Sequence, residues 1–142
     1  MLNGPNLNLL GTREPAIYGT GTLADIEQRV RTVASELGVD VDFAQDNSEG
    51  AMIDRVHALH GRAAGAIINA GAYSHTSLAL RDAFASVNVP FVEVHLTNIY
   101  AREPERRHSM LAPAARAVLC GFGAVGYELA LRGLVSSLAS HG

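Results

Sequence analysis

Two hydrophobic spacings alternate along this chain, and their alternation limits the folds open to it more than any other feature. Apolar residues recur every three or four positions over residues 22–37 and 48–62, which predicts two amphipathic helices. The first stretch is followed by apolar residues that alternate with polar ones at residues 39–43, and the second by a short apolar run at 65–70; each pattern predicts a strand. Helix and strand in alternation favour one parallel sheet with helices on both faces.

The same alternation continues to the end of the chain. Further helices are expected at residues 77–86 and 123–140, further strands at 91–95 and 116–120, and an irregular polar stretch at 96–113. Only Met1 and Leu2 precede the first polar loop, so we expect a first strand that is truncated at its N-terminus. The sequence therefore predicts an α/β fold with a doubly wound, five-stranded parallel sheet, and residues 1–142 form a single domain.

Local signals define the first helix and the strand after it more closely. Thr22 is a suitable N-cap, Asp25 three residues later completes a capping box, and Gly38 is a suitable stop. In residues 39–43 the apolar positions alternate with aspartates. One face of this strand is therefore exposed, and we expect it near an edge of the sheet.

All 11 basic side chains are arginine, and the chain has no lysine. This excludes a Schiff-base enzyme, a P-loop and a pyridoxal phosphate anchor, because the permanently charged guanidinium of arginine replaces lysine in none of them. The net charge is -3, and the arginines are scattered singly except at Arg106 and Arg107. The sequence lacks the basic stripe that would predict nucleic-acid binding, so we expect a small-molecule partner.

Cys120 is the lone cysteine and lies in an apolar run. A disulfide framework and a cysteine metal site are therefore excluded, and a reducing, cytoplasmic setting fits best. The sequence shows neither the charged and apolar regions of a signal peptide nor an apolar stretch of about 18 residues. We expect no membrane partner.

One motif imitates a nucleotide site. Gly121, Gly123 and Gly126 read GFGAVG between an apolar strand and a helix, which matches the dinucleotide fingerprint. Only 16 residues follow Gly126, so no second strand and no acidic residue about 20 positions on can hold a ribose. We favour a tight turn with close backbone packing over nucleotide binding.

Two other groupings are weak signals. His57 and His60 share a helix face at a spacing that a metal could use, but no cysteine or carboxylate cluster joins them, so we interpret them as solvated or capping residues. Residues 74–77 place hydroxyls beside a histidine without resembling a nucleophile elbow. A covalent serine mechanism is not indicated.

Polar side chains gather where the expected strands end. The loop from Asn3 to Gly19 is long and polar enough to be a lid, and Asn69 and His75 follow the strand at 65–70. On the strand at 91–95, Glu93 and His95 point to one face, where the carboxylate could orient the imidazole. Each such residue has a plain packing explanation, yet the topology brings them to one sheet edge, where a pocket is expected.

At these residues the sequence resembles the type II 3-dehydroquinate dehydratases. The resemblance spans nearly the whole chain in five blocks: NGPNLNLLGTREPAIYG from Asn3, INAGAYSHTSLALRDA from Ile68, VEVHLTN from Val92, AREPERRHS from Ala101 and GFGAVGYELAL from Gly121. It implies a flavodoxin-like fold and a single catalytic domain. It also implies reversible dehydration of 3-dehydroquinate to 3-dehydroshikimate in the shikimate pathway, without cofactor or metal. The expected assembly is a homododecamer built from trimers.

The resemblance also implies roles for residues at matching positions. Tyr18 matches the proton acceptor, His95 the proton donor and Arg13 the arginine that stabilises the transition state. Asn6 matches the residue that holds a water against the enolate, and Glu93 the partner that orients the histidine. The expected substrate contacts are Asn69, His75, Leu96, Thr97, Arg106 and, from a neighbouring subunit, Asp82.

These side chains suit the implied chemistry. Abstracting a proton next to a ketone needs a strong base, and a tyrosine with its usual pKa near 10 supplies a phenolate only beside a cation such as Arg13. The unrelated type I enzymes use a lysine Schiff base, which this chain cannot form. The alternative class is a flavodoxin-like binding module, either a flavin carrier or a phosphoacceptor domain. The absence of lysine weighs against the phosphoacceptor domain. The absence of tryptophan and the NGPNLN loop, which stands where a flavin carrier has a phosphate loop rich in serine and threonine, weigh against the flavin carrier.

Overall fold

The protein folds around one parallel sheet of five strands. The structure, a computed structural model, describes residues 1–12, 14–18 and 21–141. Within these residues the strands lie in the order β2-β1-β3-β4-β5 and all neighbours run parallel. Their bounds are β1 Leu2–Asn3, β2 Ala44–Gln45, β3 Ala66–Asn69, β4 Phe91–His95 and β5 Ala117–Cys120. This is the flavodoxin-like strand order, so the predicted fold class is confirmed.

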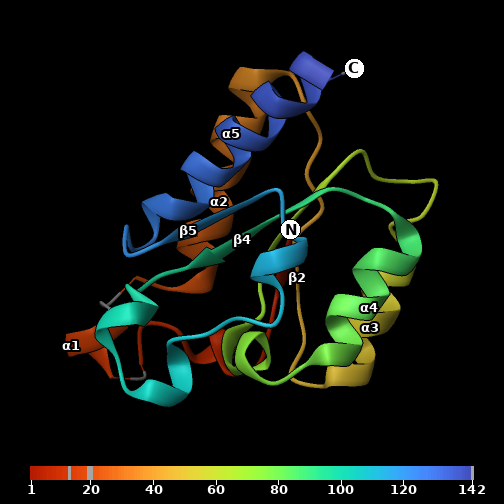
Figure 1. Cartoon of the computed structure of the whole chain (residues 1–142). Coiled ribbons are helices and arrows are strands. Elements are labelled where there is room, and N and C mark those ends of the chain that lie inside the picture. The colour runs from red at the N-terminus through yellow and green to blue at the C-terminus, as the bar shows by residue number, and fades with distance from the viewer. Residues whose placement is uncertain (13, 19–20, 142) are drawn as a thin grey trace.

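Helices cover both faces of the sheet (Figure 1). On one face α2 (Leu23–Leu37) packs against α5 (Val125–His141), and on the other α3 (Glu49–His57) packs against α4 (Leu78–Val87). A further short helix, α1 (Pro15–Tyr18), lies in the long polar loop after β1, where the sequence predicted no helix. None of the described helices is long and apolar enough to cross a membrane.

Side-chain caps determine where the helices begin. The Thr22 hydroxyl accepts the backbone N–H of Asp25 at 3.2 Å, and the Asp25 carboxylate accepts the N–H of Thr22 at 3.0 Å, which is the predicted capping box. Gly38 ends α2 with φ +69°, a left-handed conformation that favours glycine. Ser48 and Ser77 precede α3 and α4 by one residue, and the hydroxyl of each accepts a backbone N–H from the first turn of its helix.

The helix predicted over residues 48–62 extends five residues too far at its C-terminal end. After His57 the backbone closes three-residue turns instead, with N–H bonds from Leu59 to Val56 and from Arg62 to Leu59, both at 3.0 Å. Gly61 adopts φ +72° within this turn. Hydrophobic spacing does not register the change because Leu59 still packs against the core.

The strand predicted at residues 39–43 is also displaced, to Ala44–Gln45. Within the described residues β1 pairs with β2 through Leu2 opposite Ala44 and Asn3 opposite Gln45, so the residues that pair with β1 are those that follow the alternating segment. The apolar residues of this segment still pack against the core, and β2 lies at the predicted sheet edge.

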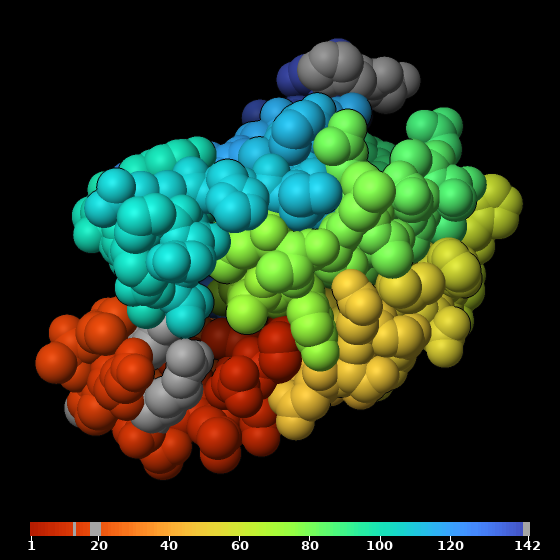
Figure 2. All heavy atoms as spheres, turned by 60° about the horizontal axis from the view of Figure 1, so that its bottom comes forward, coloured from red at the N-terminus to blue at the C-terminus, as the bar shows by residue number. Residues whose placement is uncertain are grey.

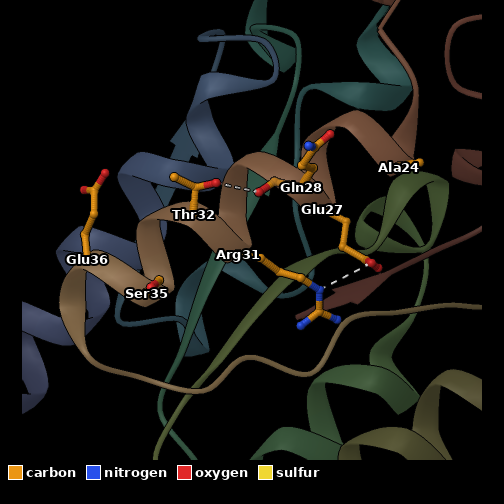
Figure 3. A pocket seen from close by; sticks show the side chains of 7 residues that line it. All are labelled: Ala24, Glu27, Gln28, Arg31, Thr32, Ser35 and Glu36. Carbon is orange, nitrogen blue, oxygen red and sulfur yellow. Dashed lines mark hydrogen bonds and ion pairs between the residues drawn. The ribbon is translucent and has the colours of Figure 1, made fainter.

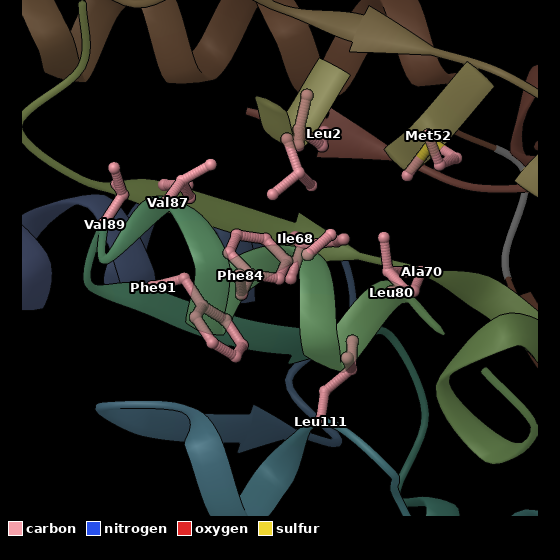
Figure 4. Close-up of a cluster of buried hydrophobic side chains, with 13 residues drawn as sticks. Leu2, Met52, Ile68, Ala70, Leu80, Phe84, Val87, Val89, Phe91 and Leu111 are labelled. Carbon is pink, nitrogen blue, oxygen red and sulfur yellow. The ribbon is translucent and has the colours of Figure 1, made fainter. Parts of the chain in front are cut away.

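Two hydrophobic cores, one on each face of the sheet, hold these layers together. Figure 4 shows the core beneath α3 and α4, where the rings of Phe84 and Phe91 stack with their centroids 4.0 Å apart. The second core joins α2 and α5 to the sheet through residues such as Val30 and Leu131.

The stretch 96–113, predicted as irregular, contains the short 3-10 turns η3 (Ile99–Ala101), η4 (Pro104–Arg106) and η5 (Ala112–Ala114).

Candidate active site

A pocket of 160 Å³ opens at the carboxyl ends of β1, β3 and β4. This is the edge where the strand order reverses between β1 and β3, and open parallel sheets bind ligands at such a point. In Figure 2 the N-terminal segment in red and orange, the segment after β3 in green and the segment after β4 in cyan meet on this face. The pocket is lined by Pro5, Asn6, Leu7, Asn69, Gly71, Ala72, His75, His95, Leu96, Thr97, Ile99, Arg102 and Arg106.

The first loop meets the end of β3 through an unusually close backbone contact at Gly4. The Gly4 N–H donates to the Asn69 carbonyl at 2.8 Å, and a Cβ on Gly4 would lie 2.3 Å from the Ala70 carbonyl oxygen. Only glycine fits there. The contact leads directly into Asn6, which has φ +69° and whose N–H donates to Asn47 Oδ1 at 3.0 Å.

Glu93 and His95 alternate along β4, so both side chains project to one face of the sheet as predicted. His95 Nε2 lies 3.5 Å from Glu93 Oε1, and Glu93 is 0% exposed. The Ser109 hydroxyl donates to the same Oε1 and accepts the N–H groups of Leu111 and Ala112 at 3.1 Å each. Because Ser109 fixes the Glu93 oxygen that lies nearest the imidazole, the carboxylate can hold the orientation of His95.

Two more histidines stand beside His95. His75 Nδ1 lies 2.6 Å from the His108 carbonyl and His108 Nε2 lies 2.8 Å from the His75 carbonyl, while the His75 ring stacks on His95 with centroids 6.0 Å apart. Burial lowers the pKa of His75, and the nearby His95 and Arg106 lower it further, against the raising effect of the His108 carbonyl. A neutral His75 that donates through Nδ1 presents Nε2 as a hydrogen-bond acceptor.

Arginines supply the positive charge of the site. Arg102 and Arg106 both line the pocket, and Glu103 pairs with Arg106 and lies 4.0 Å from Arg102 Nη2. A hydrogen bond from its own backbone N–H and then the bond from Arg106 hold the pKa of Glu103 below its usual value. Guanidinium groups at the wall of a small pocket favour a ligand with a carboxylate.

Beneath the pocket, the Tyr127 phenol links two buried carboxamides. Its hydroxyl donates to Asn3 Oδ1 at 2.7 Å and accepts from Asn69 Nδ2 at 2.9 Å. Asn3 and Tyr127 are both 0% exposed, and burial raises the pKa of Tyr127 so that the phenol stays protonated. This group joins β1, β3 and α5 under Asn69.

The structure brings most of the predicted site residues together. Seven line the pocket, and Glu93 lies directly behind His95; the seven are Asn6, Asn69, His75, His95, Leu96, Thr97 and Arg106. Asp82 does not line it, because it lies on the exposed face of α4. Arg13 lies outside the described residues, and Tyr18 is described only as the last residue of α1.

Arg102 and Arg106, which the sequence placed together on the loop after the strand at 91–95, both line the pocket. Sequence reasoning missed three residues of this neighbourhood, the partners of the lining residues: Ser109, His108 and Tyr127. Tyr127 and Ser109 lie 58 and 16 positions from the side chains they bind. No spacing rule connects such distant positions. The one available signal was a tyrosine inside the otherwise apolar face that follows the GFGAVG motif.

The GFGAVG glycines serve the turn between β5 and α5. Gly121 and Gly123 adopt φ +96° and +63°, and a Cβ on Gly126 would contact Val94 at 3.7 Å. The N–H of Gly126 donates to the Gly123 carbonyl at 3.1 Å. Gly121 and Gly123 thus form the tight turn that the sequence favoured, whereas the packing at Gly126 is an ordinary side-chain contact.

The other sequence groupings do not join the pocket. His57 ends α3 on the surface, and the His60 ring lies 3.4 Å from the Val87 carbonyl. Across the described ranges no three histidine, cysteine or acidic side chains converge as metal ligands would. A separate hollow over α2 (Figure 3) is lined by one helix only, and there Arg31 pairs with Glu27 at 3.4 Å, so its side chains cannot converge on a ligand.

Comparison with known proteins identifies close relatives across nearly the whole chain. A family model described as dehydroquinase class II matches residues 1–135. The 3-dehydroquinate dehydratase of Gemmatimonas aurantiaca is 64% identical over 138 residues, which cover 97% of this chain and 91% of the relative. The 3-dehydroquinate dehydratase of a Jannaschia species is 57% identical over 138 residues, which cover 97% of this chain and 93% of the relative. The crystal structure of type II dehydroquinase from Propionibacterium acnes is similar with a TM-score of 0.91 at 42% identity, covering 95% of this chain and 93% of that one.

Proposed function

The chain belongs to the class II dehydroquinase family, and we propose that its pocket removes water from 3-dehydroquinate with Tyr18 as base and His95 as acid. The activity follows from the family: the chain is a 3-dehydroquinate dehydratase, a hydro-lyase of the shikimate pathway. The roles of individual residues are the proposal. The observation that carries it is the meeting of His95, His75 and Arg106 in one small pocket at the switch point of the sheet.

The first step is removal of the proton next to the ketone. Tyr18 as phenolate takes this proton. The electron pair of the broken carbon–hydrogen bond forms the carbon–carbon double bond of an enolate, and the negative charge moves onto the carbonyl oxygen. Arg13, five residues earlier in the same loop, lowers the pKa of the phenol and stabilises the enolate charge. Asn6, which lines the pocket, holds a water that donates to the enolate oxygen.

The second step is loss of the hydroxyl at the neighbouring carbon. The enolate collapses, the carbon–oxygen bond breaks, and His95 gives its proton to the departing hydroxyl so that water leaves. Glu93, 3.5 Å from His95 Nε2, orients the ring for this transfer. Arg106, His75 and Asn69, with Leu96 and Thr97, hold the substrate; Arg106 suits its carboxylate and His75 its hydroxyls.

The activity is tested by incubating the protein with 3-dehydroquinate and no added cofactor. The product is a conjugated enone, so ultraviolet absorbance should rise as it forms. Folded protein that gives no such rise would overturn the functional assignment.

The residue roles are tested separately with two variants. Tyr18→Phe should abolish turnover while substrate binding persists, whereas Tyr100→Phe, which alters an exposed tyrosine outside the pocket, should not change the rate. His95→Ala should lose dehydration yet retain exchange of the alpha proton with solvent, with His57→Ala as its control. Appreciable turnover by Tyr18→Phe, or unchanged turnover by His95→Ala, removes the role assigned to that residue.

We also propose that the protein works as a homododecamer of trimers in which Asp82 completes a neighbouring copy's pocket. In support, Asp82 is exposed on α4, lies outside its own chain's pocket, and has no hydrogen-bond partner for its carboxylate among the described residues. A mixture of Tyr18→Phe and Asp82→Ala subunits, dissociated and reassembled, should regain activity that neither variant has alone. Absence of recovery in assembled hybrids, or a monomer by light scattering, counts against the proposal.

A cytoplasmic location remains part of this proposal. It is supported by the lone Cys120, which is half-buried and free, as expected in a reducing compartment. Fractionation of the source cells tests it, and recovery of the protein from an extracytoplasmic fraction would contradict it.

A further inference from the structure

The orientation of one pocket carboxamide is determined by a phenol beneath it. We propose that Tyr127 is a positioning residue that holds Asn69 with its N–H side, and not its oxygen, available to the substrate. The proposal rests on the proposed function, because it specifies how the same pocket binds its ligand. Three hydrogen bonds, read in order from the edge of the sheet, carry it.

The first bond fixes Asn3. Its Nδ2 donates to the Ala44 carbonyl at 3.1 Å, and a carbonyl can only accept. A flipped carboxamide would place Oδ1 against that oxygen with no proton between them, so Oδ1 of Asn3 must face the opposite way, toward Tyr127.

The second bond assigns the only proton of the phenol. Asn3 Oδ1 is an acceptor 2.7 Å from Tyr127 Oη, so the hydroxyl proton points to Asn3. Burial keeps the phenol protonated, since it raises the pKa of Tyr127. The oxygen of Tyr127 can therefore only accept on its other side.

The third bond transmits this choice to the pocket. Asn69 lies 2.9 Å from Tyr127 Oη and must present Nδ2 there as a donor, which leaves Oδ1 to accept the Gly71 N–H at 3.2 Å. Asn69 is 4% exposed and lines the pocket, and its second Nδ2 hydrogen has no partner among the described residues. That hydrogen is the group offered to a ligand oxygen.

The consequence is a site that favours hydrogen-bond acceptors at this position. The carboxylate and hydroxyl oxygens of the substrate can accept from Asn69, whereas a flipped Asn69 would place an oxygen against them. Without Tyr127 only the Gly71 N–H, 3.2 Å from Asn69 Oδ1, distinguishes the two orientations of the carboxamide, so a larger part of the population would present the unfavourable one.

Tyr127→Phe removes the hydroxyl and keeps the ring, so it tests the orientation directly. If Asn69 contributes to binding in the ground state and the transition state alike, KM should rise about tenfold while kcat changes little. Tyr100→Phe is the matched control, because Tyr100 is exposed and outside the pocket. A Tyr127→Phe protein with wild-type KM would overturn the proposal.

A double-mutant cycle separates positioning from general damage to the fold. In an Asn69→Ala background there is no carboxamide to orient, so adding Tyr127→Phe should leave KM unchanged. If Tyr127→Phe raises KM equally in both backgrounds, its effect does not pass through Asn69 and the proposal is wrong.

A second measurement needs no variant and serves if Tyr127→Phe fails to fold. In the nitrogen-15 spectrum of the wild-type protein, the two Nδ2 protons of Asn69 should behave differently when an equilibrium mixture of 3-dehydroquinate and 3-dehydroshikimate is added. The proton bonded to Tyr127 should stay protected from exchange, and the other should shift. Unequal behaviour supports the proposal, and equal behaviour overturns it. Failure of the proposed function would instead show as wild-type protein that forms no product.

Discussion

Among the described glycines outside the left-handed positions, Gly4 is the one whose replacement by alanine is expected to destabilise the protein most. The new Cβ would lie 2.3 Å from the Ala70 carbonyl oxygen and 2.6 Å from its carbon, and both are backbone atoms that cannot rotate away. Reaching ordinary contact requires β1 and β3 to separate by about 1 Å. The Gly4 N–H bond to Asn69, 2.8 Å long, would then be lost.

The size of the effect follows from these two changes. Losing a buried backbone hydrogen bond costs about 1–3 kcal/mol, and forcing a methyl group into a packed contact costs about as much again, so Gly4→Ala should lower the free energy of unfolding by roughly 2–6 kcal/mol. β1 has only two residues and pairs on both sides, so it has little length over which to absorb the shift. Asn6, two residues on, should be displaced with it, and kcat/KM should fall.

Urea denaturation at one fixed protein concentration measures the effect, since an oligomer's stability depends on concentration. The matched control is Gly133→Ala in α5, where an added Cβ meets nothing within 4 Å and alanine should stabilise the helix by about 0.5–1 kcal/mol. If Gly4→Ala unfolds within about 0.5 kcal/mol of the wild type, the close contact does not constrain this position and the reasoning fails.

Two further changes test other parts of the site. Ser109→Ala removes the donor to Glu93 and the acceptor of two backbone N–H groups, so it should lower the free energy of unfolding by about 1–3 kcal/mol. Its control, Ser35→Ala at an exposed position, should stay within about 0.5 kcal/mol of wild type. Equal free energies of unfolding for the two variants would contradict the hydrogen bonds assigned to Ser109. The pKa of His75 is lowered from 6.5, so its stabilising contribution is present above about pH 6.5 and is lost as pH falls, because the unfolded chain binds the proton first. Unfolding curves at pH 7 and 5.5 should therefore show a smaller loss for His75→Gln than for wild type or His57→Gln, and an unchanged loss would contradict the lowered pKa.

The sequence predicts the fold well where burial alone decides an element. β4 has the predicted bounds because all five of its residues are buried, and α2 begins and ends at the predicted cap and glycine. β2 and the end of α3 are misplaced because backbone pairing decides them. The β2 ladder depends on which residues lie opposite Leu2 and Asn3, and α3 ends where the backbone changes to tighter turns, neither of which hydrophobic spacing records.

For the site, sequence reasoning locates the residues that follow strands and misses those that hold them. His95 and Asn69 could be predicted because parallel strands bring their carboxyl ends to one edge. Ser109 and Tyr127 could not, since each meets its partner only after distant segments pack together. The roles of Arg13 and Tyr18 stay predictions, because Arg13 and the Tyr18 side chain fall outside the described residues.

The glycine turn before α5 also bears on how motifs are interpreted in unfamiliar genomes. GFGAVG satisfies a nucleotide-binding pattern letter for letter, yet Gly121 and Gly123 serve here to permit two left-handed residues in a turn. The spacing of the glycines thus specifies the backbone path from a strand into a helix, and sites with unrelated ligands can share that path. The same turn places Tyr127 two residues after the start of α5, where its hydroxyl donates to Asn3 and accepts from Asn69. The helix that would carry a nucleotide's phosphate in the other use of this spacing here supports a carboxamide of the pocket from below.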